Sequence, residues 1–177
     1  GNMVQVLGLR LKAKPSHDAD YTDKTFFKEQ WGAESVEALF ESLDSVIAKI
    51  PEKERWNIYY TASVCYSDEP RKFYRQDILP IDIDDIDISK VDQYIAIVCD
   101  FFSVTRDDII IVFSGNGLQF ILHLQDAIVA PDFFINNRVY YKAMCGELAV
   151  KIFEAGLIGQ VDTSVFSSAR LLRLPST

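Results

Sequence analysis

The sequence predicts an α+β protein in which helices pack against a mainly antiparallel sheet. Several short segments are rich in β-branched and aromatic residues, which favours strands. Other segments carry apolar residues at helical spacing, and Ser114-Gly115-Asn116-Gly117 joins two apolar segments with an Asn-Gly hairpin signal. The 177 residues are 49% hydrophobic and 25% charged, which excludes global disorder and predicts a single globular domain over residues 1–177.

The first half of the chain predicts a strand, a loop, a helix and a second strand. Residues 3–12 alternate in polarity and predict a strand. Residues 13–32 are polar and predict a loop that could hold one short helix. Apolar residues at helical spacing predict a helix over Ser35–Ile50, and Trp56–Cys65 predicts a strand. A polar loop over 66–76 follows.

The second half predicts three strands and two helices, followed by short extended segments in 157–177. In chain order, the elements are a strand over Ile78–Ile83, a helix over Ser89–Ser103 capped by Ser89 or a near neighbour, hairpin strands over Ile109–Phe113 and Leu118–Leu124, and a helix over Asn136–Ala155 ended by Gly156. No repeat or interdomain linker interrupts this pattern.

Acidic residues give the chain a formal net charge of −8, from 26 acids and 18 bases. Nearly all of the excess lies in residues 77–108, which contain 9 acids and 2 bases. An acidic balance argues against a generic DNA-coating protein, which would present a basic face. The concentrated acids fit either a solvated acidic loop or a metal site.

Asp82 and Asp84 stand at the centre of this acidic window, at the end of a predicted strand. Because strand side chains alternate, both carboxylates point to one face and Ile83 points to the other. Two adjacent like charges favour a bound cation, and carboxylate oxygens suit Mg²⁺ or Mn²⁺. A solvated acidic turn is an equal alternative for this pair, and Asp85 and Asp87 are interpreted as solvated.

The glycine-rich turn of the predicted hairpin is a candidate phosphate site. Ser114, Gly115, Asn116 and Gly117 could expose consecutive backbone N–H groups to a phosphate. Gln119 could add a side-chain donor, and His123 shares its strand face. A plain hairpin turn is the alternative, and it is the more common use of such a sequence.

The last part of the chain adds a lone acid and two arginines. Asp162 stands among small and apolar residues, and Arg170 and Arg173 follow it. Arginine binds two phosphate oxygens at once, so this pair could hold a phosphate, although pairing with surface acids would also explain it. Arg71, Lys72 and Arg75 are further candidates for template or phosphate contact, with an ordinary surface loop as the alternative.

The order of these motifs resembles the catalytic domain of the archaeo-eukaryotic primase superfamily. Asp-x-Asp at a strand end precedes a helix, Ser-Gly-x-Gly, a long helix and an isolated Asp with Ala-Arg-x-x-Arg-x-Pro behind it. The resemblance covers roughly residues 56–177, and its most specific part runs from Asp162 to Pro175. The sequence looks most like the primase-polymerases of phages, plasmids and mobile elements. The resemblance implies a sheet similar to that of RNA-recognition (RRM-like) domains, joined to a small N-terminal α/β unit.

The resemblance also implies roles for individual residues. The family's metal-binding acids fall on Asp82, Asp84 and Asp162. Its nucleotide-binding serine and histidine fall on Ser114 and Gln119, and Arg170 and Arg173 follow the third acid, where the family binds nucleotide phosphates. Gln119 is a departure, because glutamine can donate a hydrogen bond but carries no charge.

Three hypotheses follow for the function. The first is two-metal nucleotidyl transfer by a DNA primase or polymerase, with two Mg²⁺ or Mn²⁺ ions, nucleoside triphosphates and a DNA template and primer. The second is a primase-like nucleotide- or nucleic-acid-binding module with weak or lost catalysis in a replication initiator, which Gln119 favours. The third is an Asp-x-Asp phosphohydrolase with Asp82 as nucleophile. That family usually has Thr or Val two residues after the second acid, whereas this sequence has Ile86 there.

The remaining expectations concern the cellular context. The chain is expected to be a fragment of a longer replication protein, with a helicase or other replication domain behind it, or a short stand-alone member. No apolar run is long enough for a membrane span, and no secretory signal is recognisable. Three widely separated cysteines match no zinc spacing and indicate reduced thiols in a cytoplasmic protein.

Overall fold

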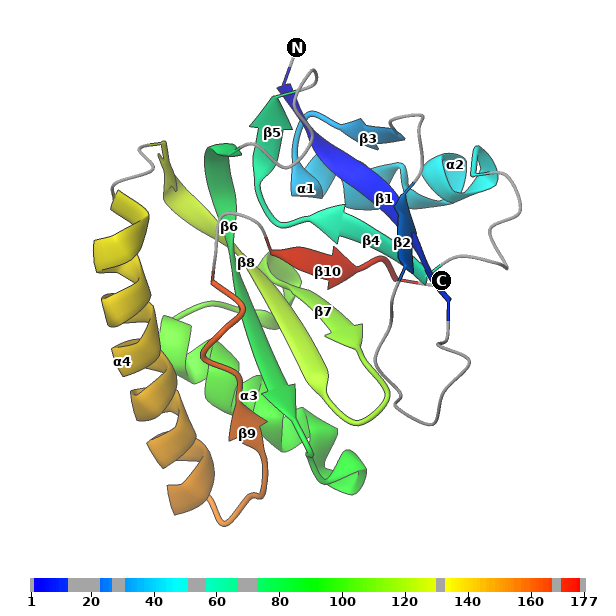
Figure 1. Ribbon diagram of the computed structural model, residues 1–177. Helices are drawn as coiled ribbons and strands as arrows, with labels where there is room; N and C mark the ends of the chain where they lie inside the picture. Colours follow the sequence, from blue (N-terminus) through cyan, green and yellow to red (C-terminus); the bar gives the residue numbers. More distant parts are fainter. Residues whose placement is uncertain are drawn as a thin grey trace. The chain divides into compact units, whose positions relative to one another are not determined.

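The computed structural model describes residues 2–12, 23–26, 31–50, 57–66, 73–129, 133–166 and 170–175. Its contacts divide the chain into two compact units. The first unit comprises residues 1–76 and 168–177, and the second comprises residues 77–167. Figure 1 shows helices together with antiparallel strands in both, which confirms the predicted α+β class. The RRM-like detail stays a prediction.

The first unit is built around a long first strand. Its elements are β1 (Asn2–Lys12), β2 (Asp23–Phe26), β3 (Trp31–Ala33), α1 (Val36–Glu41), α2 (Leu43–Ala48), β4 (Asn57–Thr61), β5 (Val64–Tyr66), the first residues of β6 (Phe73–Asp84) and β10 (Leu171–Arg173). The strands are ordered β10-β4-β1-β5-β6, and β2 and β3 also pair with β1. All the pairings of β1 are antiparallel.

Two predictions for the first unit are wrong because distant strand partners outweigh the local sequence. Within the predicted loop 13–32, the described residues include β2 and β3, which pair with β1 at Leu9↔Phe26 and Val4↔Ala33. Within the predicted loop 66–76, β6 already begins at Phe73, which pairs with Cys65 of β5. Segments predicted as loops therefore become strands where they pair with β1 or β5.

Two predicted elements are interrupted by hydroxyl side chains. The helix over Ser35–Ile50 breaks into α1 and α2 at Ser42, whose hydroxyl donates a hydrogen bond of 2.8 Å to the Ala38 carbonyl. The strand over Trp56–Cys65 breaks into β4 and β5, and the Thr61 hydroxyl donates across the break to the Ser63 carbonyl at 2.8 Å. Short hydroxyl side chains compete with the backbone for its own carbonyls, which explains both interruptions.

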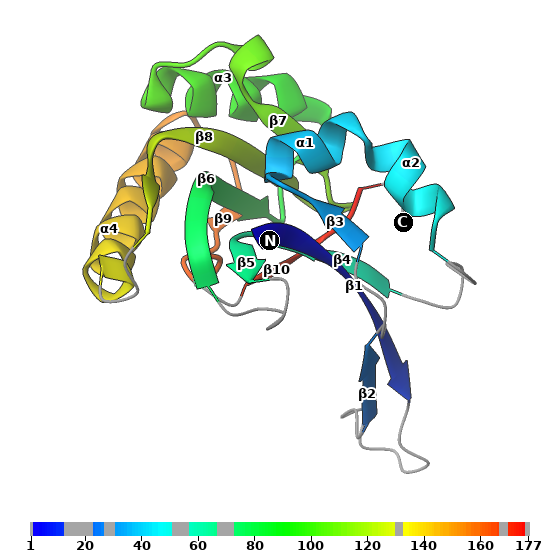
Figure 2. The same cartoon turned by 90° about the horizontal axis from the view of Figure 1, so that it is seen from above.

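The second unit places helices on a sheet ordered β9-β6-β8-β7. After β6 follow the 3₁₀ turn η2 (Ile88–Lys90), α3 (Val91–Phe102), η3 (Arg106–Asp108), β7 (Ile110–Phe113), β8 (Leu118–Ile128), α4 (Phe133–Glu154) and β9 (Gln160–Val161). Figure 1 and Figure 2 both show α3 covering one face of the strands β6, β8 and β7. Helix α4 contacts α3 and β9.

The local signals of the second unit are largely confirmed. Helix α3 lies within the predicted segment, but the capping bond belongs to the 3₁₀ turn η2 in front of it, where the Asp87 carboxylate accepts from the Ser89 N–H at 3.0 Å. Hydrogen bonds from the hydroxyl and the backbone N–H of Ser89 lower the pKa of the Asp87 carboxyl. Helix α4 ends in front of Gly156, which has the positive φ of 73° that favours glycine there. No helix in the described part of the chain is both long and apolar enough to cross a membrane.

The hairpin between β7 and β8 is confirmed, but its turn uses other residues than the Asn-Gly pair. The strands pair from Ile110↔Ile121 to Phe113↔Leu118. The central turn residues are therefore Gly115 and Asn116, and Gly115 takes a φ of 84°. A positive φ at the first central position is typical of a type II′ turn, which glycine favours.

Gly117 is required by its contact with β6. A Cβ atom on this residue would lie 2.3 Å from the Ile83 carbonyl oxygen and 3.2 Å from the Asp84 Oδ1. The Asn116 carbonyl accepts the Ile86 N–H at 3.1 Å, so the turn is fixed to the chain that leaves β6. The absence of a side chain at Gly117 lets β8 approach the end of β6.

Replacing Gly117 with alanine should therefore destabilise the protein. Because the nearest neighbouring atom, the Ile83 carbonyl oxygen, belongs to the backbone, we expect a loss of about 1–3 kcal/mol in the free energy of unfolding, measured by urea denaturation. Gly146→Ala is the matched control, since a Cβ there meets no atom within 4 Å and lies in helix α4. That control should gain roughly 0.5–1 kcal/mol. Equal stability of the two variants would contradict the close approach of Gly117 to β6.

Candidate metal centre

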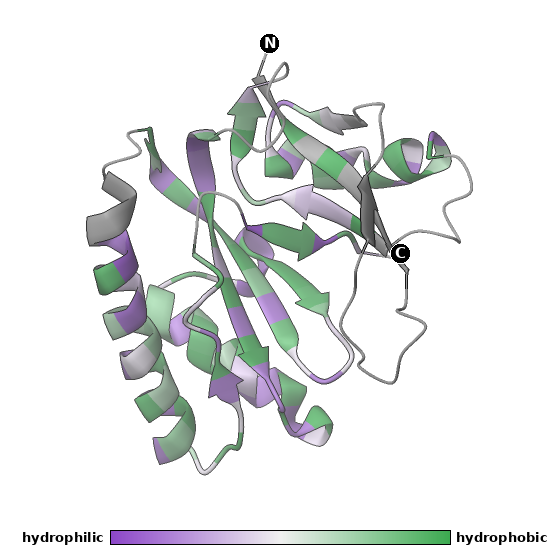
Figure 3. Cartoon of the chain, viewed as in Figure 1, coloured by the Kyte–Doolittle hydropathy of each residue, from purple (hydrophilic) through white to green (hydrophobic). Residues whose placement is uncertain are grey.

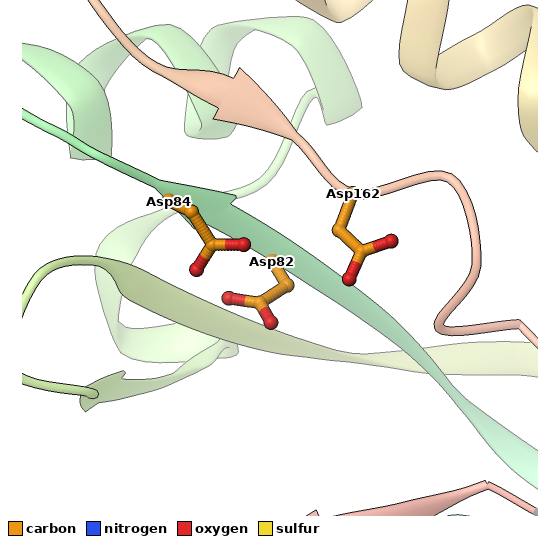
Figure 4. A group of neighbouring side chains, drawn as sticks. All are labelled: Asp82, Asp84 and Asp162. Carbon is orange, nitrogen blue, oxygen red and sulfur yellow. The ribbon is translucent and has the colours of Figure 1, made fainter. Parts of the chain in front are cut away.

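The end of β6 presents Asp82 and Asp84 on one face of the strand. Ile81 and Ile83, which alternate with them, are fully buried at 0% exposure, whereas both aspartates are partly exposed. Figure 4 shows the two side chains projecting from the same face of β6. The alternation of strand side chains therefore places the two carboxylates together, as the sequence predicts.

Asp162 reaches the same place through the short strand β9. This strand pairs with β6 at Ile83↔Val161 and Asp84↔Gln160. The backbone N–H of Asp162 then donates to the Asp82 carbonyl oxygen at 2.9 Å. One carboxylate oxygen from each of Asp82, Asp84 and Asp162 lies within 4.8 Å of the others. We call these three residues the carboxylate cluster.

Ser164 orients the third carboxylate. Its backbone N–H and its hydroxyl both donate to Oδ1 of Asp162, at 2.8 Å and 2.6 Å. An aspartate that bonds the backbone two residues ahead forms a local turn, so the rotamer of Asp162 is fixed by its own chain. Ser164 is not among the site residues predicted from the sequence, although the Asp-Thr-Ser spacing is the signal for such a turn.

Tyr94 holds the chain segments on both sides of the cluster. Its buried hydroxyl accepts the Asp87 N–H at 3.1 Å and donates to the Ile158 carbonyl. Asp87 lies just beyond β6, and Ile158 lies just before β9. Gly159 also packs tightly here, since a Cβ on it would lie 3.3 Å from Cγ2 of Ile83. The side chain of Tyr94 therefore fixes the position of β9 beside β6.

Tyr141 of α4 is a second positioning residue that the sequence analysis missed. Its hydroxyl donates to the Pro80 carbonyl at 2.6 Å, and its ring stacks on Phe166 with centroids 5.0 Å apart. Burial raises the pKa of Tyr141 far above its usual value, and the thiol of Cys145 and the charges of Asp162 and Asp82 add to this. The hydroxyl therefore stays protonated and keeps donating to β6.

The glycine-rich turn lies next to the cluster through Gly117 and Asp84. Within the turn, the N–H of Ser114 donates to the Gly117 carbonyl and that of Asn116 donates to the Ser114 carbonyl. These two N–H groups are therefore used inside the hairpin. Gln119 is only 8% exposed, while His123 is exposed. Phosphate binding by Ser114, Gly115, Asn116, Gly117, Gln119 and His123 stays a prediction.

The predicted basic residues belong to the first unit, whereas the cluster belongs to the second. Arg170 precedes β10, and its carbonyl accepts the Ala62 N–H at 3.0 Å. The Arg173 guanidinium lies 5.6 Å from the centre of the Tyr59 ring. Arg75 lies in β6 rather than in a loop, and its Nη2 donates to the Glu34 carbonyl at 3.3 Å. Arg71 and Lys72 lie outside the described residues.

The donor set of the cluster fits a divalent cation. Three carboxylates supply hard oxygen atoms, two from β6 and one from the residue that follows its partner strand β9, and all three side chains retain partial exposure. Such oxygen ligands suit Mg²⁺ and Mn²⁺, which also keep water molecules and bind phosphate oxygens. Without a cation, three like charges this close repel one another.

Known proteins are similar to this chain in structure rather than in sequence. No protein-family model matches the sequence, and no curated protein matches it. The polymerase domain of ligase D from Mycobacterium tuberculosis, solved in complex with DNA, is similar at a TM-score of 0.54 and 12% identity, over 98% of this chain and 68% of that one. The likeness concerns the fold alone. The primase-polymerase domain of cyanophage S-2L is 13% identical over 97% of this chain and 72% of its own, at a TM-score of 0.46.

Removing the hydroxyl of Tyr94 should loosen the segments that carry the cluster. Tyr94→Phe leaves the Asp87 N–H and the Ile158 carbonyl without this partner, so we expect a loss of about 1–3 kcal/mol in unfolding free energy. Tyr140→Phe is the control, because Tyr140 is 72% exposed and should change stability by less than about 0.5 kcal/mol. Chemical denaturation measures both, and equal values would contradict the bridging role of Tyr94.

Proposed function

We propose that this chain is the catalytic domain of a nucleotidyltransferase of the archaeo-eukaryotic primase superfamily. It would synthesise or extend primers on a DNA template, like the primase-polymerases of phages, plasmids and mobile elements. The observation that carries the proposal is the convergence of Asp82, Asp84 and Asp162, from two separate parts of the sequence, within 4.8 Å. The fold shared with a polymerase domain supports it.

In this proposal the three carboxylates hold two Mg²⁺ or Mn²⁺ ions. Such ions would lower the pKa of the attacking hydroxyl and neutralise charge on the leaving pyrophosphate. Asp82 and Asp84 are fixed by the alternation of β6, and Asp162 by its backbone bond to Asp82 and by Ser164. The protein contributes a rigid set of ligands, so catalysis consists mainly of positioning and charge neutralisation.

The chemical step joins a nucleotide to a hydroxyl group. The primer 3′-oxygen attacks the α-phosphorus of a nucleoside triphosphate, the bond to pyrophosphate breaks, and the hydroxyl proton is released. We propose that the turn Ser114–Gly117 and Gln119 contact the triphosphate, because Gly117 lies directly beside Asp84. Roles for Arg170 and Arg173 in holding the phosphates stay predictions.

Metal binding can be measured without activity, by thermal unfolding with and without Mn²⁺. We expect Mn²⁺ to raise the Tm of the wild type, because a ligand that binds only the folded state stabilises it. Asp84→Asn and Asp162→Asn should raise the Tm in EDTA by relieving repulsion and should abolish most of the rise with Mn²⁺. Asp85→Asn, at an exposed neighbour, is the control. The same Mn²⁺ response in all four proteins would exclude the cluster as the site.

Catalysis is tested by extension of a labelled primer on a DNA template with Mn²⁺ and nucleoside triphosphates. Asp82→Asn and Asp84→Asn should each reduce the extension rate by at least about a hundredfold, since each removes a metal ligand. Asp85→Asn should extend like the wild type. Extension that survives in the cluster variants would overturn the proposal.

A catalytically silent nucleotide-binding module is the second candidate. Gln119, at the position of the family's histidine, favours it because a neutral amide offers no charge to the triphosphate. This candidate predicts metal-dependent binding of a fluorescent nucleotide without extension. Under the first candidate, Gln119→His would raise the extension rate, whereas under the second it would not produce extension.

A further inference from the structure

Helix α4 carries apolar residues on two opposite faces. One face, formed by Tyr141, Cys145, Leu148 and Ile152, is buried in the second unit. The other consists of Val139, Ala143, Gly146, Val150 and Phe153, all of which are exposed. We call these five residues the outer stripe. Figure 3 shows hydrophobic and hydrophilic residues interleaved along the coloured part of α4.

The outer stripe has the spacing of a coiled-coil seam. Its members follow one another at intervals of four, three, four and three residues, which is the heptad pattern of helices that pair along their length. Its large members are open to solvent, with Val139 66%, Val150 52% and Phe153 80% exposed. A surface helix normally carries polar residues on its outer face, so this stripe indicates a partner.

The residues in the middle of the outer stripe have small side chains or none. Ala143 and Gly146 lie between Val139 and Val150, and a Cβ on Gly146 would meet no atom within 4 Å. A second helix could therefore approach closely at the centre while larger side chains pack at both ends. The 22 residues of α4 are long enough for two heptads of contact.

Charges of opposite sign flank the outer stripe. With 100° of rotation per residue, Arg138 and Lys142 lie along one side, whereas Glu147 and Glu154 lie along the other. Lys142 and Glu147 are exposed, and neither forms an ion pair with another residue that the structure describes. Glu154 is paired with Lys151 at 3.9 Å. Lys151 lies on the same side as the two glutamates, so the contrast across the stripe is between Lys142 on one side and Glu147 on the other.

This charge distribution is complementary to that of a second copy of α4 in one direction only. If two copies pair by a two-fold axis parallel to α4, Lys142 of each helix faces Glu147 of the second copy. In an antiparallel pair, the side with Glu147 would meet the same side of the second copy. We propose that the outer stripe of α4 is a homodimer interface in which the two helices run parallel.

The oligomeric state tests this proposal directly. Sedimentation equilibrium over the micromolar to millimolar range should show the wild type dimerising with increasing concentration. Phe153→Asp and Val150→Asp should be monomeric throughout, with unchanged circular dichroism because both side chains are already exposed. Ile88→Asp, at a 59% exposed apolar residue outside α4, is the control and should dimerise normally. A monomeric wild type up to the millimolar range would overturn the proposal.

Charge exchange tests the parallel arrangement. Lys142→Glu and Glu147→Lys alone should each weaken dimerisation at least tenfold, and the double variant should restore it, because the two positions then exchange signs across the interface. In a parallel pair, Val139→Cys should form a disulfide with its own counterpart in a Cys99→Ser background, where the remaining cysteines are buried. Crosslinking only between Val139→Cys and Phe153→Cys would show an antiparallel pair and contradict the assigned direction.

Discussion

The pairing of β9 with the end of β6 is the interaction on which the candidate site depends. Only Gln160 and Val161 form this strand, yet they bring Asp162 from the far end of the second unit to Asp82. Two residue pairs contribute little stability by themselves, so the contact needs support from elsewhere. Tyr94 and Gly159 supply it by fixing the chain that enters β9. The geometry of the carboxylate cluster therefore depends on the contacts of Tyr94 and Gly159, which hold β9 beside β6.

Electrostatics explains why a site of this kind needs such support. Three carboxylates within 4.8 Å of one another repel, and the surrounding window is strongly acidic while the rest of the chain is close to neutral. The backbone bond from Asp162 to Asp82 and the two donors of Ser164 oppose this repulsion. A fold that holds like charges together is stabilised most when a cation binds, and such a cation would reconcile the acidic composition with the proposed nucleic-acid substrate.

Elements specified by local signals could be predicted, and elements that depend on distant partners could not. The amphipathic helices α3 and α4 and the β7–β8 hairpin follow from periodicity and turn residues. Strands β2 and β3 and the first residues of β6 could not be predicted from their own sequence, because they form by pairing with β1 and β5. The interruptions at Ser42 and after Thr61 involve hydrogen bonds from single hydroxyl groups. The sequence does not show which carbonyl such a hydroxyl will bond, because that depends on the local conformation.

The sequence by itself determined that Asp82 and Asp84 share one face of a strand, because alternation is a property of the extended backbone. It also determined the order of the motifs, and hence the resemblance to primases. The resemblance implied Asp162 as the third acid, and the tertiary structure shows its carboxylate beside the pair. Only the tertiary structure decided that Gln119 is buried and that Gly117 is needed for contact with β6. These are relations between residues far apart in the chain. Periodicity cannot encode them, because they are fixed by packing and long-range hydrogen bonds.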